Sequence, residues 1–414
     1  MQVPQKSLGS VGRVDYLDTM FSSRLPADLT ENRLSRAVTL ARARKTPVLD
    51  LTETNPTRVG LGVPPGVLAP LSDRASLTYE PQALGLASAR RAVSQDFRRR
   101  GLEVPAHCIV LTASTSEAYS LLFKLLCDPG DEVLVAQPSY PLFDHLTRLD
   151  AVRARPYRLE YHGTWMLDVD GVARAVTPRT RAILAVSPNN PTGSFLSADE
   201  IDALGEICAA RDLALIGDEV FADYVMEEGD GCPVSMLARP RALTFGLGGL
   251  SKSAGLPQLK LAWMGIGGPD DRVARARERL ELVADTYLSV STPVQQAAGA
   301  LIAAGRGIRS ALLARVRANY RDLATLVGAA APCTLLPAQG GWSAVVQVPA
   351  TVPEEALVLA LLEEDRVLVH PGYFFDFPRE AFLVVSLLPE PEIFREGVRR
   401  MLGRVAADGE LSIG

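Results

Sequence analysis

The chain has 414 residues, and its 43 basic and 48 acidic residues give a net charge of −5. Such a near-balance gives no reason to expect nucleic acid or a membrane surface as a partner. The longest apolar runs are broken well short of the roughly 20 residues that a membrane span needs. No basic-then-apolar secretion signal opens the chain, and the five cysteines form no Cys-x-x-Cys pair. We therefore expect a cytoplasmic protein with no disulfide framework and no metal site.

The predicted elements alternate between helices and short apolar strands. Residues 1–28 show no periodicity and are expected to form an arm, and a helix is predicted from Thr30, as its N-cap, to Lys45. Further helices are expected over 86–99, 118–126 and 198–210, and strands over 48–51, 108–111, 132–136, 182–186, 213–216 and 242–245. Short, fully apolar strands between helices predict an α/β fold with a mainly parallel sheet, covered on both faces.

Polar clusters follow several of these strands directly, at 112–117, 137–141, 187–193 and 217–221. Ligands of open α/β sheets bind at the carboxyl ends of the strands, so we expect the clusters to converge on one site. Ser114 and Thr115 stand where a helix begins, and unpaired N–H groups at such a place attract anions. Either hydroxyl could also serve simply as a helix cap.

Lys252 stands among small residues in the stretch Gly-Leu-Gly-Gly-Leu-Ser-Lys-Ser-Ala-Gly, directly after the strand predicted to end at residue 245. Only five of the basic residues are lysines, and of these only Lys252 and Lys260 lie at a strand-to-loop transition. A lysine in such a turn is expected to be partly desolvated. Burial lowers the pKa of an amine and makes it a nucleophile, as Schiff-base chemistry requires. We predict that Lys252 holds a pyridoxal cofactor.

The pattern changes after about residue 290. Two successive helices are predicted over 295–308 and 308–327, followed by strands over 343–348, 367–370 and 382–387 and by helices over 354–364 and 392–405. These elements indicate a smaller α+β unit, to which the first helix is expected to add. We predict an arm and part of the small domain in 1–55, a large cofactor-binding domain in 56–290 and the rest of the small domain in 291–414.

The chain resembles the class I/II aminotransferases, which are fold-type-I pyridoxal-phosphate enzymes, over roughly residues 30–400. The resemblance lies in Tyr-x-Pro-x-x-x-Gly at Tyr79–Gly85, Pro-Ser-Tyr at Pro138–Tyr140, Asn-Asn-Pro-Thr-Gly at Asn189–Gly193, Asp-Glu-Val at Asp218–Val220 and Ser-Lys at Ser251–Lys252. The order and spacing of these motifs are more specific than any one of them. The resemblance implies a large domain with a mainly parallel sheet flanked by helices, and a smaller α+β domain.

The resemblance also implies a role for each matched residue. Lys252 would bind pyridoxal 5'-phosphate as a Schiff base and, once substrate displaces it, would move the reacting proton. Asp218 would keep the pyridine nitrogen protonated, Asn190 would donate to the phenolic oxygen, and Tyr140 would stack on the ring. Lys252, Asp218 and Tyr140 would thus be catalytic. The phosphate would be held by Ser114, Thr115, Ser251, Lys260 and Tyr79, the last reaching across the interface of a homodimer.

Four differences from the family pattern concern the cofactor. The phosphate-binding arginine eight residues after the lysine is Lys260, and the serine three residues before it is Gly249, with Ser251 as the expected substitute. The tyrosine after Asp-x-Val is Phe221, which cannot donate to the phenolic oxygen, so either Asn190 is left as the main donor there or Tyr224 compensates. Two glycines near the phosphate arginine are Gln258 and Ala262.

A fifth difference concerns the substrate. The arginine that grips the α-carboxylate two residues before a serine is Val384 here. Arg58 is the first candidate to replace it, and Arg24 is the second. Trp342 and Tyr373 would line the substrate pocket, or else belong to the small-domain core, whereas we interpret His370 as structural.

The predicted function is an aminotransferase that moves an amino group between an amino acid and a 2-oxo acid, by a ping-pong mechanism through pyridoxamine phosphate. The alternative on the same scaffold is a pyridoxal-dependent lyase, cyclase or oxidase that acts on an unusual amine, because of Val384. A pyridoxal-binding regulator is disfavoured because the residues before the first helix are too few for a DNA-binding domain. A nicotinamide enzyme is disfavoured because no Gly-x-Gly-x-x-Gly follows an early strand.

Overall fold

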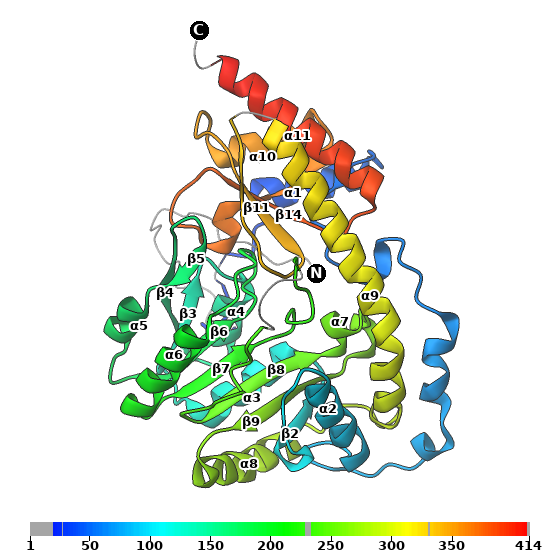
Figure 1. The fold of residues 1–414 in the computed structure, drawn as a ribbon, viewed down its shortest axis with the longest axis vertical. Coiled ribbons are helices and arrows are strands. Elements are labelled where there is room, and N and C mark those ends of the chain that lie inside the picture. Colours follow the sequence, from blue (N-terminus) through cyan, green and yellow to red (C-terminus); the bar gives the residue numbers. More distant parts are fainter. Residues whose placement is uncertain (1–19, 27, 228–232, 330–331, 412–414) are drawn as a thin grey trace.

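An eight-stranded sheet lies at the centre of the computed structural model, which describes residues 20–26, 28–227, 233–329 and 332–411 (Figure 1). The strand order is β2-β9-β8-β7-β6-β3-β4-β5. The strands are β2 (Ile109–Thr112), β3 (Glu132–Gln137), β4 (Arg153–Tyr161), β5 (Trp165–Leu167), β6 (Thr180–Val186), β7 (Ala214–Asp218), β8 (Thr244–Gly249) and β9 (Ala262–Gly267). Only β5 and β9 run against the others. The predicted α/β fold with a mainly parallel sheet is confirmed, although β4, β5 and β9 were not predicted.

Helices cover both faces of this sheet, which explains why its central strands are apolar throughout. They are α2 (Ala87–Arg99), α3 (Thr115–Leu126), α4 (Leu142–Leu149), α5 (Val169–Ala175), α6 (Ala198–Arg211), α7 (Leu250–Ser253) and α8 (Asp270–Asp285). Neighbouring residues of one strand enter different cores because side chains alternate along it. Leu215 of β7 packs in one core with Leu204 of α6, whereas Ile216 packs in the other with Leu122 of α3.

The glycines before Lys252 form a strand, not a turn. We expected the strand to end at residue 245, but β8 continues to Gly249. A side chain at these positions would meet its neighbours: a Cβ on Gly248 would lie 2.6 Å from the indole nitrogen of Trp263. The glycines therefore let the neighbouring side chains approach the backbone closely. As a result, Lys252 belongs to the short helix α7 at the end of the strand, and the predicted turn is wrong.

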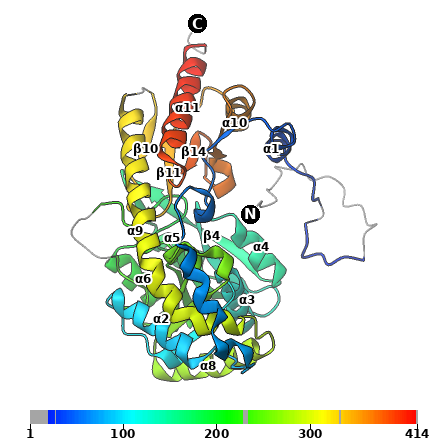
Figure 2. The same cartoon turned by 90° about the vertical axis from the view of Figure 1, so that its right-hand side faces the viewer.

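A second unit is built around the antiparallel sheet β10-β11-β14-β13, formed by β10 (Thr334–Leu336), β11 (Ser343–Gln347), β14 (Phe382–Ser386) and β13 (His370–Pro371). Its helices are α10 (Glu354–Glu363) and α11 (Pro391–Leu411). The strand β1 (Leu49–Asp50) pairs with β12 (Val367–Leu368), and α1 (Arg33–Ala43) packs against α10 (Figure 2). The residues before the large unit thus join the C-terminal ones in space.

The first helix begins later than predicted. The side chain of Asn32, not that of Thr30, caps α1, because it accepts a hydrogen bond of 2.7 Å from the backbone N–H of Ser35. Most of the arm expected over 1–28 lies outside the described residues. Short 3-10 helices connect the larger elements: η1 (Pro56–Arg58), η2 (Pro65–Ser72), η3 (Arg74–Leu77), η4 (Ala106–Cys108), η5 (Pro257–Leu259) and η6 (Gly372–Phe375).

A single helix, α9 (Thr292–Ala329), joins the two units, where we predicted two successive helices. It packs on α2 of the large unit and on α11 of the small one, as Figures 1 and 2 show. Gly305 lies inside the helix because a Cβ there would clash with Ala254, just after α7. The helix therefore keeps its glycine for close packing beside the lysine segment, not for a break.

By length and composition alone, α9 is apolar enough to cross a membrane. Its contacts are those of a helix packed within a protein. Leu301, Leu312 and Leu323 are buried in the core. Asn319 donates to the carbonyl oxygens of Leu387 and Pro389, at 2.9 and 2.8 Å. We therefore interpret α9 as a core helix.

Candidate active site

The sheet brings the predicted polar clusters to one edge. Strands β2, β3, β6, β7 and β8 run in the same direction, so their carboxyl ends lie at the same edge. The residues that end them or follow them include Ser114, Tyr140, Asn190, Asp218 and Lys252. This edge is therefore the candidate active site.

The Lys252 amine lies among aromatic rings. Its Nζ is 4.8 Å from the ring centroid of Trp342 and 5.3 Å from that of Phe221. Desolvation lowers the pKa of Lys252 to about 8, against the opposing effect of the Asp218 charge. An amine with this pKa is partly neutral near neutral pH and is therefore an effective nucleophile.

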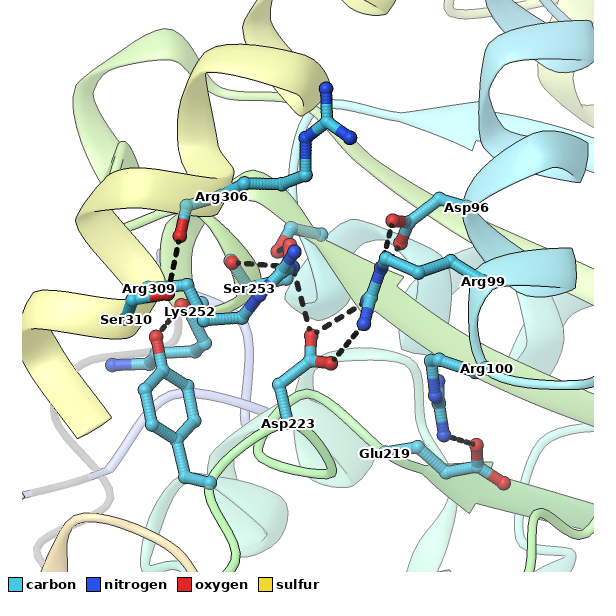
Figure 3. Close-up of polar contacts among 12 residues, drawn as sticks. Asp96, Arg99, Arg100, Glu219, Asp223, Lys252, Ser253, Arg306, Arg309 and Ser310 are labelled. Carbon is cyan, nitrogen blue, oxygen red and sulfur yellow. Dashed lines mark hydrogen bonds and ion pairs between the residues drawn. The ribbon is translucent and has the colours of Figure 1, made fainter. Parts of the chain in front are cut away.

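Side chains from other elements hydrogen-bond to the backbone of the lysine segment, Leu250–Ser253 (Figure 3). The Tyr224 hydroxyl donates to the carbonyl oxygen of Lys252 at 2.5 Å, and Arg309 of α9 donates to that of Ser253 at 3.1 Å. Asp223 pairs with Arg309 at 3.2 Å and with Arg99 of α2 at 2.8 Å. These contacts tie the segments after β7 and β8 to two helices, and so fix the direction from which the amine enters the site.

One expectation about this region is corrected. The Tyr224 hydroxyl hydrogen is used by the Lys252 carbonyl, so Tyr224 does not replace the donor missing at Phe221. Glu219, the neighbour of Asp218 in the chain, is a buried acid. It accepts from Arg100 at 2.7 Å, from the Ser235 hydroxyl at 2.7 Å and from the backbone N–H of Met236. Of the two neighbouring acids, Glu219 is thus neutralised by an arginine, whereas Asp218 is not.

Asp218 is the last residue of β7 and is only 8% exposed. Burial raises its pKa. The Tyr119 hydroxyl donates to one carboxylate oxygen at 2.5 Å, and the backbone N–H of Val220 donates to the other at 3.1 Å. No ion pair to Asp218 is present among the described residues. A buried carboxylate without a cation is costly, so this site is suited to a ligand with a positive N–H.

Tyr119 is a site residue that the sequence did not reveal as one. It lies on α3, 99 positions before Asp218. Its only sequence signal is a hydroxyl on the apolar face of a helix, where a buried tyrosine needs a hydrogen-bond partner. The identity of that partner depends on the fold, because nothing local in the sequence relates α3 to the end of β7.

Tyr140 and Asn190 both precede Asp218 in the chain and lie in the loops that follow β3 and β6. Tyr140 is 36% exposed, and desolvation with the nearby Asp218 charge raises its pKa to about 12, so its hydroxyl stays protonated. The amide oxygen of Asn190 accepts from Ser343 of β11 at 3.3 Å. Its amide nitrogen has no partner in the part of the chain that the structure describes, so it can donate to a ligand.

The N-terminus of α3 shows one of the two predicted uses of its hydroxyls, the helix cap. Ser114 is the N-cap, and its Oγ accepts from the backbone N–H of Glu117 at 3.1 Å. The backbone N–H groups of Thr115 and Ser116 make no hydrogen bond to other described residues. With the helix dipole, they provide donors for an anion such as a phosphate.

Three other residues were predicted to bind the cofactor phosphate: Ser251, Lys260 and Tyr79. Ser251 is half-buried in α7, and Lys260 is exposed, with a positive φ of 50°. Tyr79 is 70% exposed on the surface of the large unit. Within the described ranges, no hydrogen bond or ring contact links these three side chains to Lys252.

The residues predicted to bind the substrate lie in different parts of the structure. Trp342 lies directly beside the Lys252 amine. Tyr373 instead packs on Phe374, with ring centroids 4.9 Å apart, and its backbone binds Glu354 in the small unit. Arg58 is exposed in η1, and Arg24 donates to the carbonyl oxygen of Leu149 at 3.1 Å. The sequence thus located one wall of the site but left the partner for a substrate carboxylate open.

Val384 and His370 belong to the small-unit sheet. Val384 is buried in β14, where it pairs with Val345 and His370. Burial lowers the pKa of His370 to about 4, and its ring packs against Phe374 and Phe375, 5.8 Å from each. The imidazole is therefore neutral at physiological pH, which supports the structural role that we assigned to it.

The absence of a serine at position 249 has a steric reason. A Cβ on Gly249 would lie 2.9 Å from the Cβ and 3.1 Å from the Cα of Ala262 in the neighbouring strand β9. Two of the differences from the family pattern, Gly249 and Ala262, are therefore neighbours that accommodate each other.

We expect Gly249→Ser to destabilise the protein by about 1–3 kcal/mol, as overpacking does. Ala262→Gly should relieve part of this cost in the double variant. A double-mutant cycle of thermal unfolding measures the coupling. Additive effects of the two substitutions would contradict the steric explanation.

Comparison with known proteins agrees with this geometry. The model of the family described as "Aminotransferase class I and II" matches residues 70–398, well over half of the chain. The chain belongs to the class I and II aminotransferase family. The resemblance inferred from its motifs is therefore confirmed, and the members of this family depend on pyridoxal phosphate.

Two relatives show how far the likeness extends. The glutamate-pyruvate aminotransferase AlaA of Escherichia coli K12 is 30% identical over 252 residues, which are 60% of this chain and 62% of that enzyme. The match therefore spans less than two thirds of that relative. The alanine aminotransferase of Mycobacterium tuberculosis H37Rv is 25% identical over 369 residues, or 86% of this chain and 84% of that enzyme.

Solved structures of this family share the fold. The alanine aminotransferase from Pyrococcus furiosus has a TM-score of 0.84 at 23% identity, covering 94% of this chain and all of that one. An aminotransferase from Escherichia coli has a TM-score of 0.81 at 22% identity, covering 96% and 99%. At this identity the likeness establishes the architecture, while the activity has to be argued from the site.

The site fits the family cofactor. Asp218 is a buried carboxylate without a cation, Asn190 has a free amide nitrogen, and the N-terminus of α3 offers unpaired N–H groups. These groups match a ring nitrogen, a phenolic oxygen and a phosphate, respectively. Lys252 supplies the amine. The residues present can therefore hold pyridoxal phosphate.

Proposed function

We propose that this protein is a pyridoxal-phosphate-dependent aminotransferase that moves an amino group between an amino acid and a 2-oxo acid in two ping-pong half-reactions. The observation that carries the proposal is that two groups lie at the same sheet edge: the nucleophilic amine of Lys252 and the buried carboxylate of Asp218, which has no ion-pair partner among the described residues. The names of the relatives support this reaction and make alanine and glutamate the first donors to test.

Each side chain then has a defined task. When bound, pyridoxal phosphate supplies an electron-withdrawing ring and carries the amino group between the half-reactions. Lys252 acts first as the nucleophile and then, once released, takes up and returns the proton of the substrate carbon. Asp218 supplies the negative charge, and Asn190 supplies an N–H donor. Trp342 and Phe221 exclude water from the amine, which keeps its pKa low.

Adding single amino acids without an oxo acid tests the reaction. An aminotransferase should change the visible absorbance of the bound cofactor once and then stop, since its amino group has no acceptor. Subsequent addition of pyruvate should restore the original spectrum. Release of a stoichiometric amount of oxo acid, measured for a panel of donors, would identify the substrate.

A second candidate function is a pyridoxal-dependent lyase, cyclase or oxidase on an unusual amine. Val384 favours it, because a buried aliphatic side chain stands where the family pattern has its carboxylate-binding arginine. Such an enzyme would continue to turn over in the absence of an oxo acid. Continuous product formation under those conditions would support this candidate and contradict the aminotransferase.

The carboxylate partner is the second element to test. We propose Arg58 as the partner of the substrate carboxylate. Arg58 is exposed and ends η1, which begins at Pro56. Pro56 lies 3.7 Å from the position that a Cβ on Gly255, just after α7, would occupy. Arg58→Ala is expected to raise the KM for the amino donor about tenfold, because a charge-assisted contact is lost, and to leave kcat nearly unchanged. Arg36→Ala, on the outer helix α1, is the control. An unchanged KM for Arg58→Ala would reject this assignment.

We further propose that the protein is a cytoplasmic homodimer in which Tyr79 of each subunit reaches the phosphate of the other. Tyr79 is largely exposed and makes no contact with the site of its own chain, and the apolar side chains of Leu77 and Tyr287 are exposed too. Tyr79 and Tyr287 line one shallow pocket. Light scattering with the Tyr79→Phe variant would test this, since a monomer that binds cofactor normally contradicts the proposal.

A further inference from the structure

We propose that Tyr119 is a positioning residue of this site, whose hydroxyl holds Asp218 as an oriented anion facing the cofactor ring. The inference rests on the proposed function, because it concerns the same carboxylate. Tyr119 precedes Asp218 by 99 positions and comes from a different element, α3, which also begins at the candidate phosphate site. One helix would thus contribute to both ends of the cofactor.

The contacts of the carboxylate show why this hydroxyl matters. Each oxygen of Asp218 accepts from one neutral donor: Tyr119 at 2.5 Å on one side and the backbone N–H of Val220 at 3.1 Å on the other. Neither Arg100 nor Arg99 substitutes for them, because these two arginines pair with Glu219 and Asp223. The Tyr119 hydroxyl is therefore the only side chain in the described structure that hydrogen-bonds to Asp218.

The proton of this hydrogen bond stays on the tyrosine. Burial, with the charge of Asp218, raises the pKa of Tyr119 well above its ordinary value, so the phenol does not ionise. The same hydrogen bond lowers the pKa of Asp218, against the larger effect of burial, which raises it. Without the hydroxyl, a larger fraction of Asp218 would be protonated and unable to pair with a positive ring nitrogen.

The ring of Tyr119 is fixed by its neighbours. It stacks on Phe123 of the same helix at 6.2 Å and meets Phe143 of α4 edge-on at 5.3 Å. Phe143 in turn meets Tyr140 edge-on at 6.1 Å. The hydroxyl consequently cannot swing away from Asp218. Tyr119→Phe would keep these ring contacts and remove only the donor.

Tyr119→Phe tests the proposal by cofactor binding and spectra, independently of turnover. We expect the dissociation constant for pyridoxal 5'-phosphate, measured by equilibrium dialysis against the apoprotein, to rise about tenfold. The pH at which the visible absorbance of the bound cofactor changes should move upward. A less protonated ring nitrogen withdraws less electron density from the Lys252 nitrogen that is linked to the cofactor, so the pKa of that nitrogen rises. A merely structural role would not move this pH.

Tyr157→Phe is the matched control. Both tyrosines are 3% exposed, but the Tyr157 hydroxyl donates to the carbonyl oxygen of Leu184 at 3.0 Å and does not contact the site. The control should lose stability because one buried hydrogen bond is removed, while its cofactor affinity and absorbance pH profile stay at the wild-type values. Equal effects of both variants on the affinity would overturn the proposal.

Combining Tyr119→Phe with Asp218→Asn tests whether Tyr119 acts on the cofactor through the Asp218 carboxylate or directly. Tyr119→Phe should not weaken cofactor binding further in that background. Equal weakening in both backgrounds, or an unchanged absorbance profile of Tyr119→Phe, would overturn the assignment while leaving the proposed function intact. Failure of the wild-type protein to bind pyridoxal phosphate would instead reject the proposed function, and this inference with it.

Discussion

Replacing Lys252 by alanine is expected to reduce amino-group transfer by at least about 10³-fold, because one substitution removes both the nucleophile and the proton-transfer group. The Lys252 amine lies close to the rings of Trp342 and Phe221, whereas Lys260, which precedes β9 at the same sheet edge, is exposed. The measurement is the rate of oxo-acid formation from a competent donor, together with the visible absorbance of added pyridoxal phosphate.

The low pKa of Lys252 adds a pH dependence to this prediction. Below a pKa of about 8, most of the amine is protonated and not nucleophilic, so the rate of cofactor capture by the apoprotein should rise about tenfold per pH unit. Above that pH the rate should level off. A capture rate that still rises steeply at pH 10, as for an ordinary lysine, would contradict the desolvated environment of the amine.

Lys45→Gln serves as the control for both measurements. Lys45 is exposed just after α1, far from the sheet edge in the chain topology. It should leave the transfer rate and the capture profile unchanged. Turnover by Lys252→Ala at the rate of this control would reject the proposed mechanism.

The sequence predicted which polar residues stand at the ends of the strands better than it predicted the course of the chain between them. The apolar runs that end in Asp218 and in the loop before Asn190 are central strands, so their direction and their shared edge follow from the parallel sheet. Ser114 caps α3, and the N-terminus of the same helix offers the N–H groups of the proposed anion site. Local patterns were sufficient for these residues.

Close backbone packing limited the prediction elsewhere. Glycine usually indicates a turn, but Gly248 lies within β8 and Gly305 within α9, because Trp263 and Ala254 occupy the space that a side chain would need. Such steric reasons come from residues distant in sequence. The same limit applies to Tyr119, whose partner Asp218 becomes evident only in three dimensions.

Replacing Asp218 by asparagine is expected to have opposite effects on stability and on function. The apoprotein should become more stable, with a melting temperature higher by roughly 1–3 °C, because a buried charge without a cation is removed. The amino-donor half-reaction should slow by at least about 10²-fold, because the charge that stabilises the reacting complex is lost. Differential scanning calorimetry of the apoprotein and single-turnover spectra of the cofactor-loaded protein measure the two effects.

Burial also fixes the direction of the pH dependence. Since the pKa of Asp218 is raised in the folded protein, its contribution to stability is lost as the pH rises through that pKa. Wild-type apoprotein should therefore gain stability relative to Asp218→Asn as the solution is acidified. Bound cofactor should remove much of the difference, because its ring nitrogen supplies the missing positive partner.

Asp131→Asn is the matched control, because Asp131 is also buried but pairs with Arg181 at 2.8 Å. The backbone N–H of Asp128, followed by Arg181, lowers the pKa of Asp131, so this carboxylate stabilises the fold above its unfolded pKa. Its replacement should lower the melting temperature and leave the half-reaction unchanged. If both variants were destabilised, the charge of Asp218 would have to be compensated within the apoprotein. If the two variants differ as expected, Asp218, which has no ion-pair partner among the described residues, is retained for a ligand at a cost in stability.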